Sequence, residues 1–226
     1  MMSSSDADKK MSEARKELRE FLSKGFIEPN RGNLDEQKWK SAKPDYTLAN
    51  LAYFKGKSKN HKEGSLEKIV EDLVKTWEME ATHKTLENWT TINLEKYCTQ
   101  SNGGKIFSGK ESSELGNYNW LLSGCRKDLY DADAHTFESS HQVFKGAFLD
   151  GFPWEVIDVF SPPPFVCFSW RHWATYNGTY KGKKGNDSVV NMCGFASASL
   201  DENLKICDLK IYYKPEEFLQ VLESIN

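Results

Sequence analysis

The apolar positions of this chain follow a helical spacing in its middle and an alternating one near its end. The clearest helical pattern covers residues 64–84, where apolar residues recur at i, i+3, i+4 and i+7 behind Ser65 as N-cap. The stripe consists of Leu66, Ile69, Val70, Leu73, Val74, Trp77 and Ala81. A helix of this length and character needs a large apolar surface to lie on.

The last third of the chain supplies such a surface. Residues 154–161, 164–176, 188–200 and 204–213 are rich in β-branched and aromatic residues, and Pro, Gly and Asp-Glu-Asn turns separate them. We expect them to form an antiparallel meander, closed by a short helix that begins at Pro215. Helices first and strands afterwards predict an α+β fold in which a curved antiparallel sheet wraps around the long helix.

The remaining elements are shorter. Residues 12–24 and 44–56 fit two helices that end at Gly25 and Gly56, and residues 93–109 read as a hairpin. Residues 110–124 and 135–148 fit further helices, the second with His141 on its apolar face. We therefore divide the chain into a disordered tail (1–10), an N-terminal helical extension (11–63) and one α+β domain (64–226).

Charge and composition remove several classes of function. A net charge of −3 and a pI near 6.0 provide no positive electrostatic field that would attract nucleic acid, so we expect no nucleic-acid partner. A missing apolar signal region and the lack of a long apolar run predict a cytoplasmic protein without a membrane partner. Five scattered cysteines without a C-x-x-C pair predict no metal site, and the absence of glycine-rich phosphate-binding motifs predicts no nucleotide cofactor.

The aromatic strand at 165–176 carries the candidate chemistry. Its two faces alternate, and the more apolar one places His172 toward the concave side and Arg171 toward the outside. His172 is the candidate general base, with Asp158 of the neighbouring strand as its carboxylate partner; the alternative is a hydrogen-bonded core histidine. The residues expected to line a ligand cavity beside His172 are Trp77, His141, Phe168, Trp170 and Tyr176.

Several motifs resemble the plant pathogen-related protein family. They are the segment 64–84 with "LVKTWEME", "SSHQVF", "GFPWEVIDVFSPPP", "RHW", Gly194-x-Ala196 and "IYYKPEEFL", and the similarity extends upstream to "KWKSAKPDY". That family is placed in the nuclear transport factor 2-like superfamily, together with polyketide cyclases, ketosteroid isomerase and scytalone dehydratase. The resemblance implies a cone-shaped α+β fold, and it does not imply any particular reaction.

Three hypotheses of function follow. The first is a protein that binds a small hydrophobic molecule in an aromatic cavity, and the second is an isomerase, cyclase or dehydratase with His172 as base. The third is a non-catalytic module that forms a homodimer through the outer sheet face, where Phe165, Arg171 and Trp173 lie. Alternatively, the N-terminal extension folds over this face within one chain.

Overall fold

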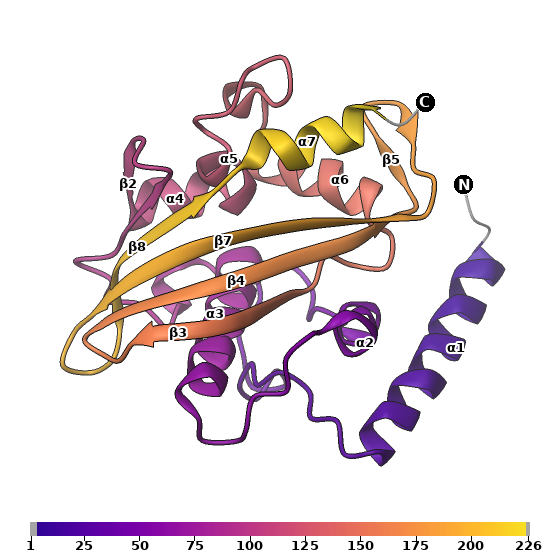
Figure 1. Ribbon diagram of the computed structural model, residues 1–226, viewed down its shortest axis with the longest axis horizontal. Coiled ribbons are helices and arrows are strands. Elements are labelled where there is room, and N and C mark those ends of the chain that lie inside the picture. Colours follow the sequence, from indigo (N-terminus) through magenta and orange to yellow (C-terminus); the bar gives the residue numbers. More distant parts are fainter. Residues whose placement is uncertain (1–3, 225–226) are drawn as a thin grey trace.

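The computed structural model describes residues 4–224 (Figure 1). The helices are α1 (Ser4–Ser23), α2 (Thr47–Gly56), α3 (Leu66–His83), α4 (Gly109–Leu115), α5 (Asn117–Leu121), α6 (Phe137–Ala147) and α7 (Pro215–Ser224), with 3₁₀ turns at Leu86–Asn88 and Ala132–Ala134. The strands are β1 (Cys98–Ser101), β2 (Ile106–Ser108), β3 (Trp154–Ser161), β4 (Phe165–Tyr176), β5 (Thr179–Tyr180), β6 (Lys183–Lys184), β7 (Ser188–Leu200) and β8 (Ile206–Tyr213).

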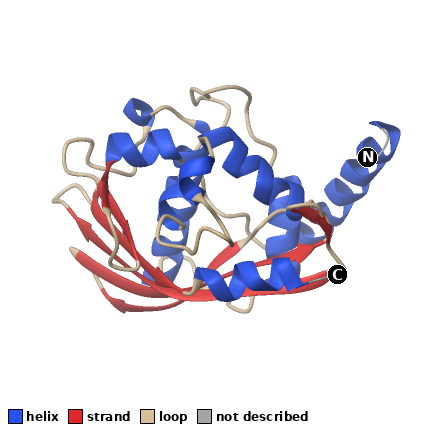
Figure 2. Cartoon of the chain, turned by 90° about the horizontal axis from the view of Figure 1, so that it is seen from above, coloured by secondary structure: helices blue, strands red, loops and turns tan. Residues whose placement is uncertain are grey.

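The main sheet has the strand order β2-β1-β8-β7-β4-β3. Its larger part, β3-β4-β7-β8, is the antiparallel meander that the sequence predicts, and the β1-β2 hairpin joins it through a parallel pairing of β1 with β8. The long strands bend together, and helices gather on the inner side of the curve (Figure 2). The predicted fold class is therefore confirmed.

Helix α3 is the central helix of this arrangement. The Ser65 hydroxyl accepts a hydrogen bond from the Lys68 amide at 3.3 Å and caps the first turn, as expected. Val70 and Val74 pack against the inner side of the sheet, whereas Ile69, at the margin of the predicted stripe, is exposed. The helix is thus buried by the sheet along the face that the apolar spacing predicts.

The first helix begins earlier than the sequence predicts. Helix α1 starts at Ser4, so residues 4–10 are helical in the structure where the sequence analysis expects a disordered tail, and residues 1–3 lie outside the described part of the chain. Helices α1 and α2 lie side by side near one end of β3 and β4 (Figure 1). Leu18 of α1 and Tyr53 and Phe54 of α2 form a buried cluster with Trp173 of β4.

This cluster covers part of the outer sheet face. The rings of Tyr53 and Trp173 stack at 6.3 Å, and a Cβ atom at Gly56 would collide with the Trp173 indole. Arg171 stacks on Trp173 at 4.4 Å and donates to the Gly56 carbonyl. The alternative in which the extension folds over Trp173 and Arg171 within one chain is therefore confirmed, while a homodimer through the outer sheet face stays a prediction.

A buried carboxylate fastens the extension to the sheet. Glu155 of β3 is fully buried, and it accepts hydrogen bonds from the Ser58 amide (2.8 Å), the Ser58 hydroxyl (2.9 Å) and the Lys59 amide (3.1 Å). The Arg171 guanidinium, which also donates to the Gly56 carbonyl, lies 3.0 Å from the same carboxylate. One acidic side chain thus joins β3, β4 and the segment that follows α2.

We expect Glu155→Gln to lower the free energy of unfolding by about 3 kcal/mol, because it leaves Arg171 and the Ser58 and Lys59 donors without an anionic acceptor. Asp158→Asn is the matched control on the same strand. Its exposed carboxylate faces Lys59 at 3.5 Å, so we expect a change below about 0.5 kcal/mol. Urea unfolding measures both variants, and equal losses in the two would show that Glu155 does not anchor the extension.

Candidate functional site

His172 lies on the concave side of the sheet, as its position in the strand predicts. It is paired with Trp154 across β3 and β4, and its ring centroid lies 3.6 Å from that of Phe152. Burial and, to a smaller extent, the nearby Lys75 ammonium lower the pKa of His172 to about 3, against the opposing effect of a hydrogen bond with the Pro153 backbone, so the imidazole is neutral at neutral pH. Within residues 4–224, its Nδ1 atom is buried without a hydrogen-bond partner.

Phe168 and Trp170 share this face with His172. Both belong to a buried cluster with Trp154, Val156 and Val70, which joins β3 and β4 to α3. The indole Nε1 of Trp170 is buried, and it too has no hydrogen-bond partner among the described residues. The structure therefore brings three of the predicted site residues onto one apolar wall, on which two hydrogen-bonding atoms stay unused.

Asp158 does not lie on this wall, and its predicted pairing with His172 is wrong. A β-bulge inserts Ile157 between Val156, which is paired with Trp170, and Asp158, which is paired with Ser169. The extra residue shifts the alternation of β3 by one position. Asp158 consequently points to the outer face, where its side chain is 58% exposed and approaches Lys59.

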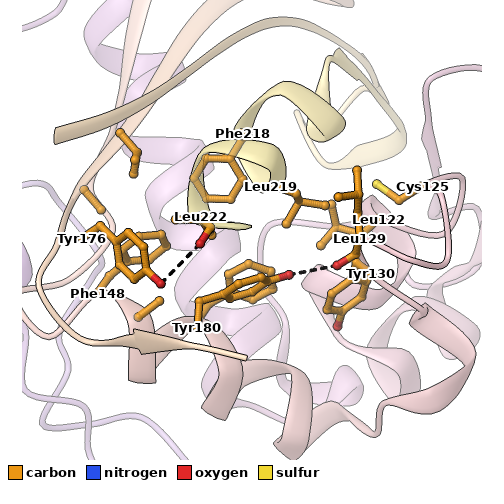
Figure 3. Close-up of a cluster of buried hydrophobic side chains, with 14 residues drawn as sticks. Leu122, Cys125, Leu129, Tyr130, Phe148, Tyr176, Tyr180, Phe218, Leu219 and Leu222 are labelled. Atoms are coloured by element: carbon orange, nitrogen blue, oxygen red, sulfur yellow. Dashed lines mark hydrogen bonds between the residues drawn. The ribbon is translucent and has the colours of Figure 1, made fainter. Parts of the chain in front are cut away.

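Trp77 and Tyr176 belong to other parts of the core. Trp77 donates a 2.8 Å hydrogen bond from Nε1 to the Tyr97 hydroxyl, within a cluster that includes Trp120. Tyr176 is fully buried under α7, and its hydroxyl donates to the carbonyl of Lys183 at 2.7 Å, with the Leu222 carbonyl at 3.4 Å (Figure 3). Both side chains are thus already satisfied by structural partners away from His172.

His141 lies on α6 and has its own set of neighbours. Its Nδ1 is 2.7 Å from the Phe137 carbonyl, its ring stacks on Phe137 at 4.4 Å, and Tyr118 meets it edge-on at 5.1 Å. Burial lowers its pKa. His141 therefore borders the helical side of the interior, near Tyr118, and not the wall formed by β4.

The apolar spacing of α3 did not identify Lys75 and Glu78. Lys75 is buried, donates to the Trp154 carbonyl at 2.5 Å and lies 4.3 Å from the Tyr53 ring centroid. Burial lowers its pKa to about 8, whereas burial raises the pKa of Glu78 despite the nearby Lys75 and Arg31 charges. Both lie in the motif "LVKTWEME", which is the sequence signal that could have marked them.

A cleft of about 540 Å³ lies in the extension, beside the start of α2. It is lined by Arg31, Tyr46 and Asn50 among others, but these side chains already bind one another. Arg31 lies 4.0 Å above the Tyr46 ring and donates to the Asn50 amide oxygen at 3.1 Å. The cleft therefore lies between segments of the extension, and the polar side chains named above already have partners within the protein.

No group of three or more His, Cys, Asp or Glu side chains within residues 4–224 is arranged to hold a metal ion. None of the helices in that range is both long and apolar enough to cross a membrane.

Solved structures with a similar course of the chain have low sequence identity to it. IdmH, a candidate polyketide cyclase from Streptomyces antibioticus, is 12% identical with a TM-score of 0.42, and the similarity covers 67% of this chain and 96% of that one. A candidate SnoaL-like polyketide cyclase from Jannaschia is 9% identical with a TM-score of 0.41, covering 74% of this chain and all of the other.

The family of the chain follows from its sequence similarity to a known protein. No family model matches the chain. A protein from barley (Hordeum vulgare) named "Pathogen-related protein" is 35% identical over 184 residues, which are 79% of this chain and 78% of the barley protein. This agrees with the resemblance found in the motifs "LVKTWEME" and "RHW". The chain belongs to the pathogen-related protein family.

Proposed function

We propose that the protein binds a small, largely apolar molecule with one polar group against the concave face of β4. The observation that carries this proposal is the pair of unpartnered atoms, Trp170 Nε1 and His172 Nδ1. Each costs about 1–3 kcal/mol when buried without a partner. The two residues are separated by one position in a strand, so both side chains point to the same side.

The chemistry of the wall defines the ligand. An indole nitrogen only donates, so Trp170 calls for an acceptor such as a carbonyl or hydroxyl oxygen. The neutral imidazole of His172 offers either a donor or an acceptor, according to its tautomer. Around both atoms the wall is apolar, with Phe168, Trp154 and Val156 beside them. An oxygenated apolar molecule meets both requirements.

Gly194 on β7 leaves room for the indole of Trp170 close to the strand. The two residues are directly paired across β4 and β7, and a Cβ atom at position 194 would collide with the Trp170 ring. The missing side chain at position 194 therefore provides the space that the indole occupies.

The properties of His172 favour a role in ligand binding over a role as a general base. A group with a pKa of about 3 is a weak proton acceptor at neutral pH, and the carboxylate expected to support it lies on the opposite face. Glu78 of α3 is the other group to test for an isomerase, cyclase or dehydratase reaction, because burial raises its pKa above the ordinary value of a glutamate.

We also propose that two copies of the chain associate through the part of the outer face that the extension leaves open. Phe160, Phe165, Phe195 and Tyr212, from four adjacent strands, are 60%, 55%, 54% and 44% exposed. Charges of both signs flank them in the pairs Lys59–Asp158 and Lys210–Asp208. A twofold contact would bury the aromatic side chains against their counterparts and bring opposite charges together.

Ligand binding is tested by screening oxygenated lipophilic metabolites through tryptophan fluorescence and calorimetry. For a ligand found in this way, we expect Trp170→Phe to weaken binding about five- to tenfold, since it removes one hydrogen-bond donor. Trp77→Phe is the matched control, because that indole lies in another cluster. Equal effects of the two variants, or no perturbation by any compound class, would refute the proposal.

The neutral state of His172 predicts an acid-sensitive stability. The pKa is about 3 in the folded protein against a reference of 6.5, so the unfolded chain binds more protons between these values. The free energy of unfolding therefore falls as the pH drops below about 6.5. Between there and about pH 5 we expect His172→Phe to lose about 2 kcal/mol less than the parent protein. Parallel pH profiles in urea unfolding would contradict this assignment.

The dimer is tested by sedimentation of the full chain in the micromolar range. We expect a dimer, and we expect Phe195→Lys to sediment as a monomer, because the new charge lies at the centre of the aromatic patch. Lys43→Met, on the exposed extension, is the control and leaves the mass unchanged. A monomeric parent protein would exclude this interface.

A further inference from the structure

The segment that follows α2 carries an exposed serine at a buried charge. Residues 57–62 form neither helix nor strand, and Ser58 is exposed. Its hydroxyl donates to the fully buried carboxylate of Glu155 at 2.9 Å, and its amide donates to the same group at 2.8 Å. Ser58 therefore joins the solvent-facing side of the segment to a buried anion.

The segment is held mainly by that carboxylate. The amides of Ser58 and Lys59 both have Glu155 as their acceptor. Further along, the His61 ring contacts the Val156 carbonyl through Nε2 at 2.8 Å. Segments with few buried contacts open locally at a small cost in free energy. Such an opening presents the serine, in an extended stretch of chain, to an enzyme.

The sequence around Ser58 is basic. In the stretch "KGKSK" (residues 55–59), lysines stand three positions before the serine, one before it and one after it. Lys55 is paired with Glu17 of α1 at 2.7 Å, but this pair lies on the surface, where it contributes little. Kinases select their substrates in part by charge, and lysines ahead of a serine are complementary to a basophilic kinase, whose substrate groove is acidic.

A phosphate on Ser58 is incompatible with its bond to Glu155. Phosphoserine has no hydroxyl proton to donate, and it carries a charge of about −2 at neutral pH. The phosphate would meet a buried carboxylate whose ion-pair partner is the Arg171 guanidinium at 3.0 Å. Like charges repel strongly where water is excluded. The modified segment is therefore expected to leave the sheet.

Release of this segment also loosens α2. Tyr53 of that helix donates to Glu71 of α3 and stacks on Trp173 of β4. The Lys75 ammonium of α3 lies 4.3 Å from the same tyrosine ring. Through these contacts α2 covers part of the outer face of β4 and of the polar face of α3. A charge added at Ser58 consequently acts on all three elements.

We propose that Ser58 is a phosphorylation site for a basophilic serine kinase, and that its phosphate releases α2 and the segment after it from the sheet. In the reaction, the Ser58 Oγ forms a bond to the γ-phosphorus of ATP while the bond from that phosphorus to the bridging oxygen breaks. ADP leaves with the electron pair, and the hydroxyl proton passes to the base of the kinase. The switch does not depend on a ligand at the β4 wall.

The effect of the charge is tested by hydrogen exchange of the full chain. We expect Ser58→Glu to speed exchange of the α2 amides about tenfold, because the added charge raises the population of the released state. Ser41→Glu is the matched control, since Ser41 is exposed in a bend of the extension and lysines precede it at the same spacing, in "KWKS". Ser58→Ala removes the donor without adding charge, so we expect an increase below about threefold.

Equal exchange of α2 in Ser58→Glu and Ser41→Glu would overturn the switch. An equal effect of Ser58→Ala and Ser58→Glu would overturn it too, because the lost hydroxyl would then explain the change. Exchange of the β4 and β7 amides should stay as in the parent protein. Faster exchange there as well would contradict a release that is confined to the extension.

The modification is tested with ATP and the catalytic subunit of cyclic-AMP-dependent protein kinase, a basophilic enzyme, followed by peptide mass mapping. We expect phosphate at Ser41 and, more slowly, at Ser58, which must first leave Glu155. In Glu155→Gln we expect the rate at Ser58, relative to that at Ser41, to rise about fivefold. Absence of phosphate at Ser58 from both proteins would overturn the site, and an unchanged relative rate would overturn the control by Glu155.

Discussion

The buried carboxylate of Glu155 determines where the N-terminal extension lies. Two backbone amides, one hydroxyl and one guanidinium converge on it, so the desolvation of its charge is offset by four donors. The segment that follows α2 is thereby held against β3, and α2 against Trp173. Because the contact joins residues 96 and 97 positions apart along the chain, it fixes the extension relative to the whole sheet.

The position of the extension explains why α3 is buried on more than one face. Its apolar stripe meets the sheet, and a second, polar face meets the extension. Glu71 links the two layers, because it accepts from the Tyr53 hydroxyl of α2 and from the Val156 amide of β3, and Lys75 donates to the Trp154 carbonyl of β3. Charged residues beside the apolar stripe of a helix usually face solvent. In α3 they are buried instead, because the extension forms a second layer that covers them.

The sequence predicts long-range features well where one physical rule acts alone. Alternation along β4 placed His172 inside and Arg171 outside, since no bulge interrupts the pairing of β4 with β7. The same rule failed one strand away, because Ile157 forms a bulge that no turn residue announces. Helix α3 was predicted with its cap, whereas the helix expected at 110–124 is broken into α4 and α5 at Gly116, which has a positive φ of 82°.

The predicted site residues divide by whether their polar atoms have structural partners. Trp77 carries the same indole N–H as Trp170, and Tyr176 carries a hydroxyl, but a neighbouring side chain or carbonyl satisfies each of these two groups. An aromatic pattern cannot reveal that difference, because the partners come from distant segments such as Tyr97 and Lys183.

The accounting of buried polar atoms then separates the core from the candidate site. Glu80 is fully buried like Glu155, and Thr90 and Thr91 donate to it through both amides and both hydroxyls. Because buried polar groups are nearly always hydrogen-bonded, as these carboxylates are, an indole N–H without a partner stands out in this fold. Unpartnered buried side-chain atoms among the described residues include Gln37 Oε1 and Thr99 Oγ1, which lie on separate segments, whereas Trp170 and His172 share one strand face. A polar group of a molecule bound against this apolar wall would supply the hydrogen-bond partner that these two atoms lack.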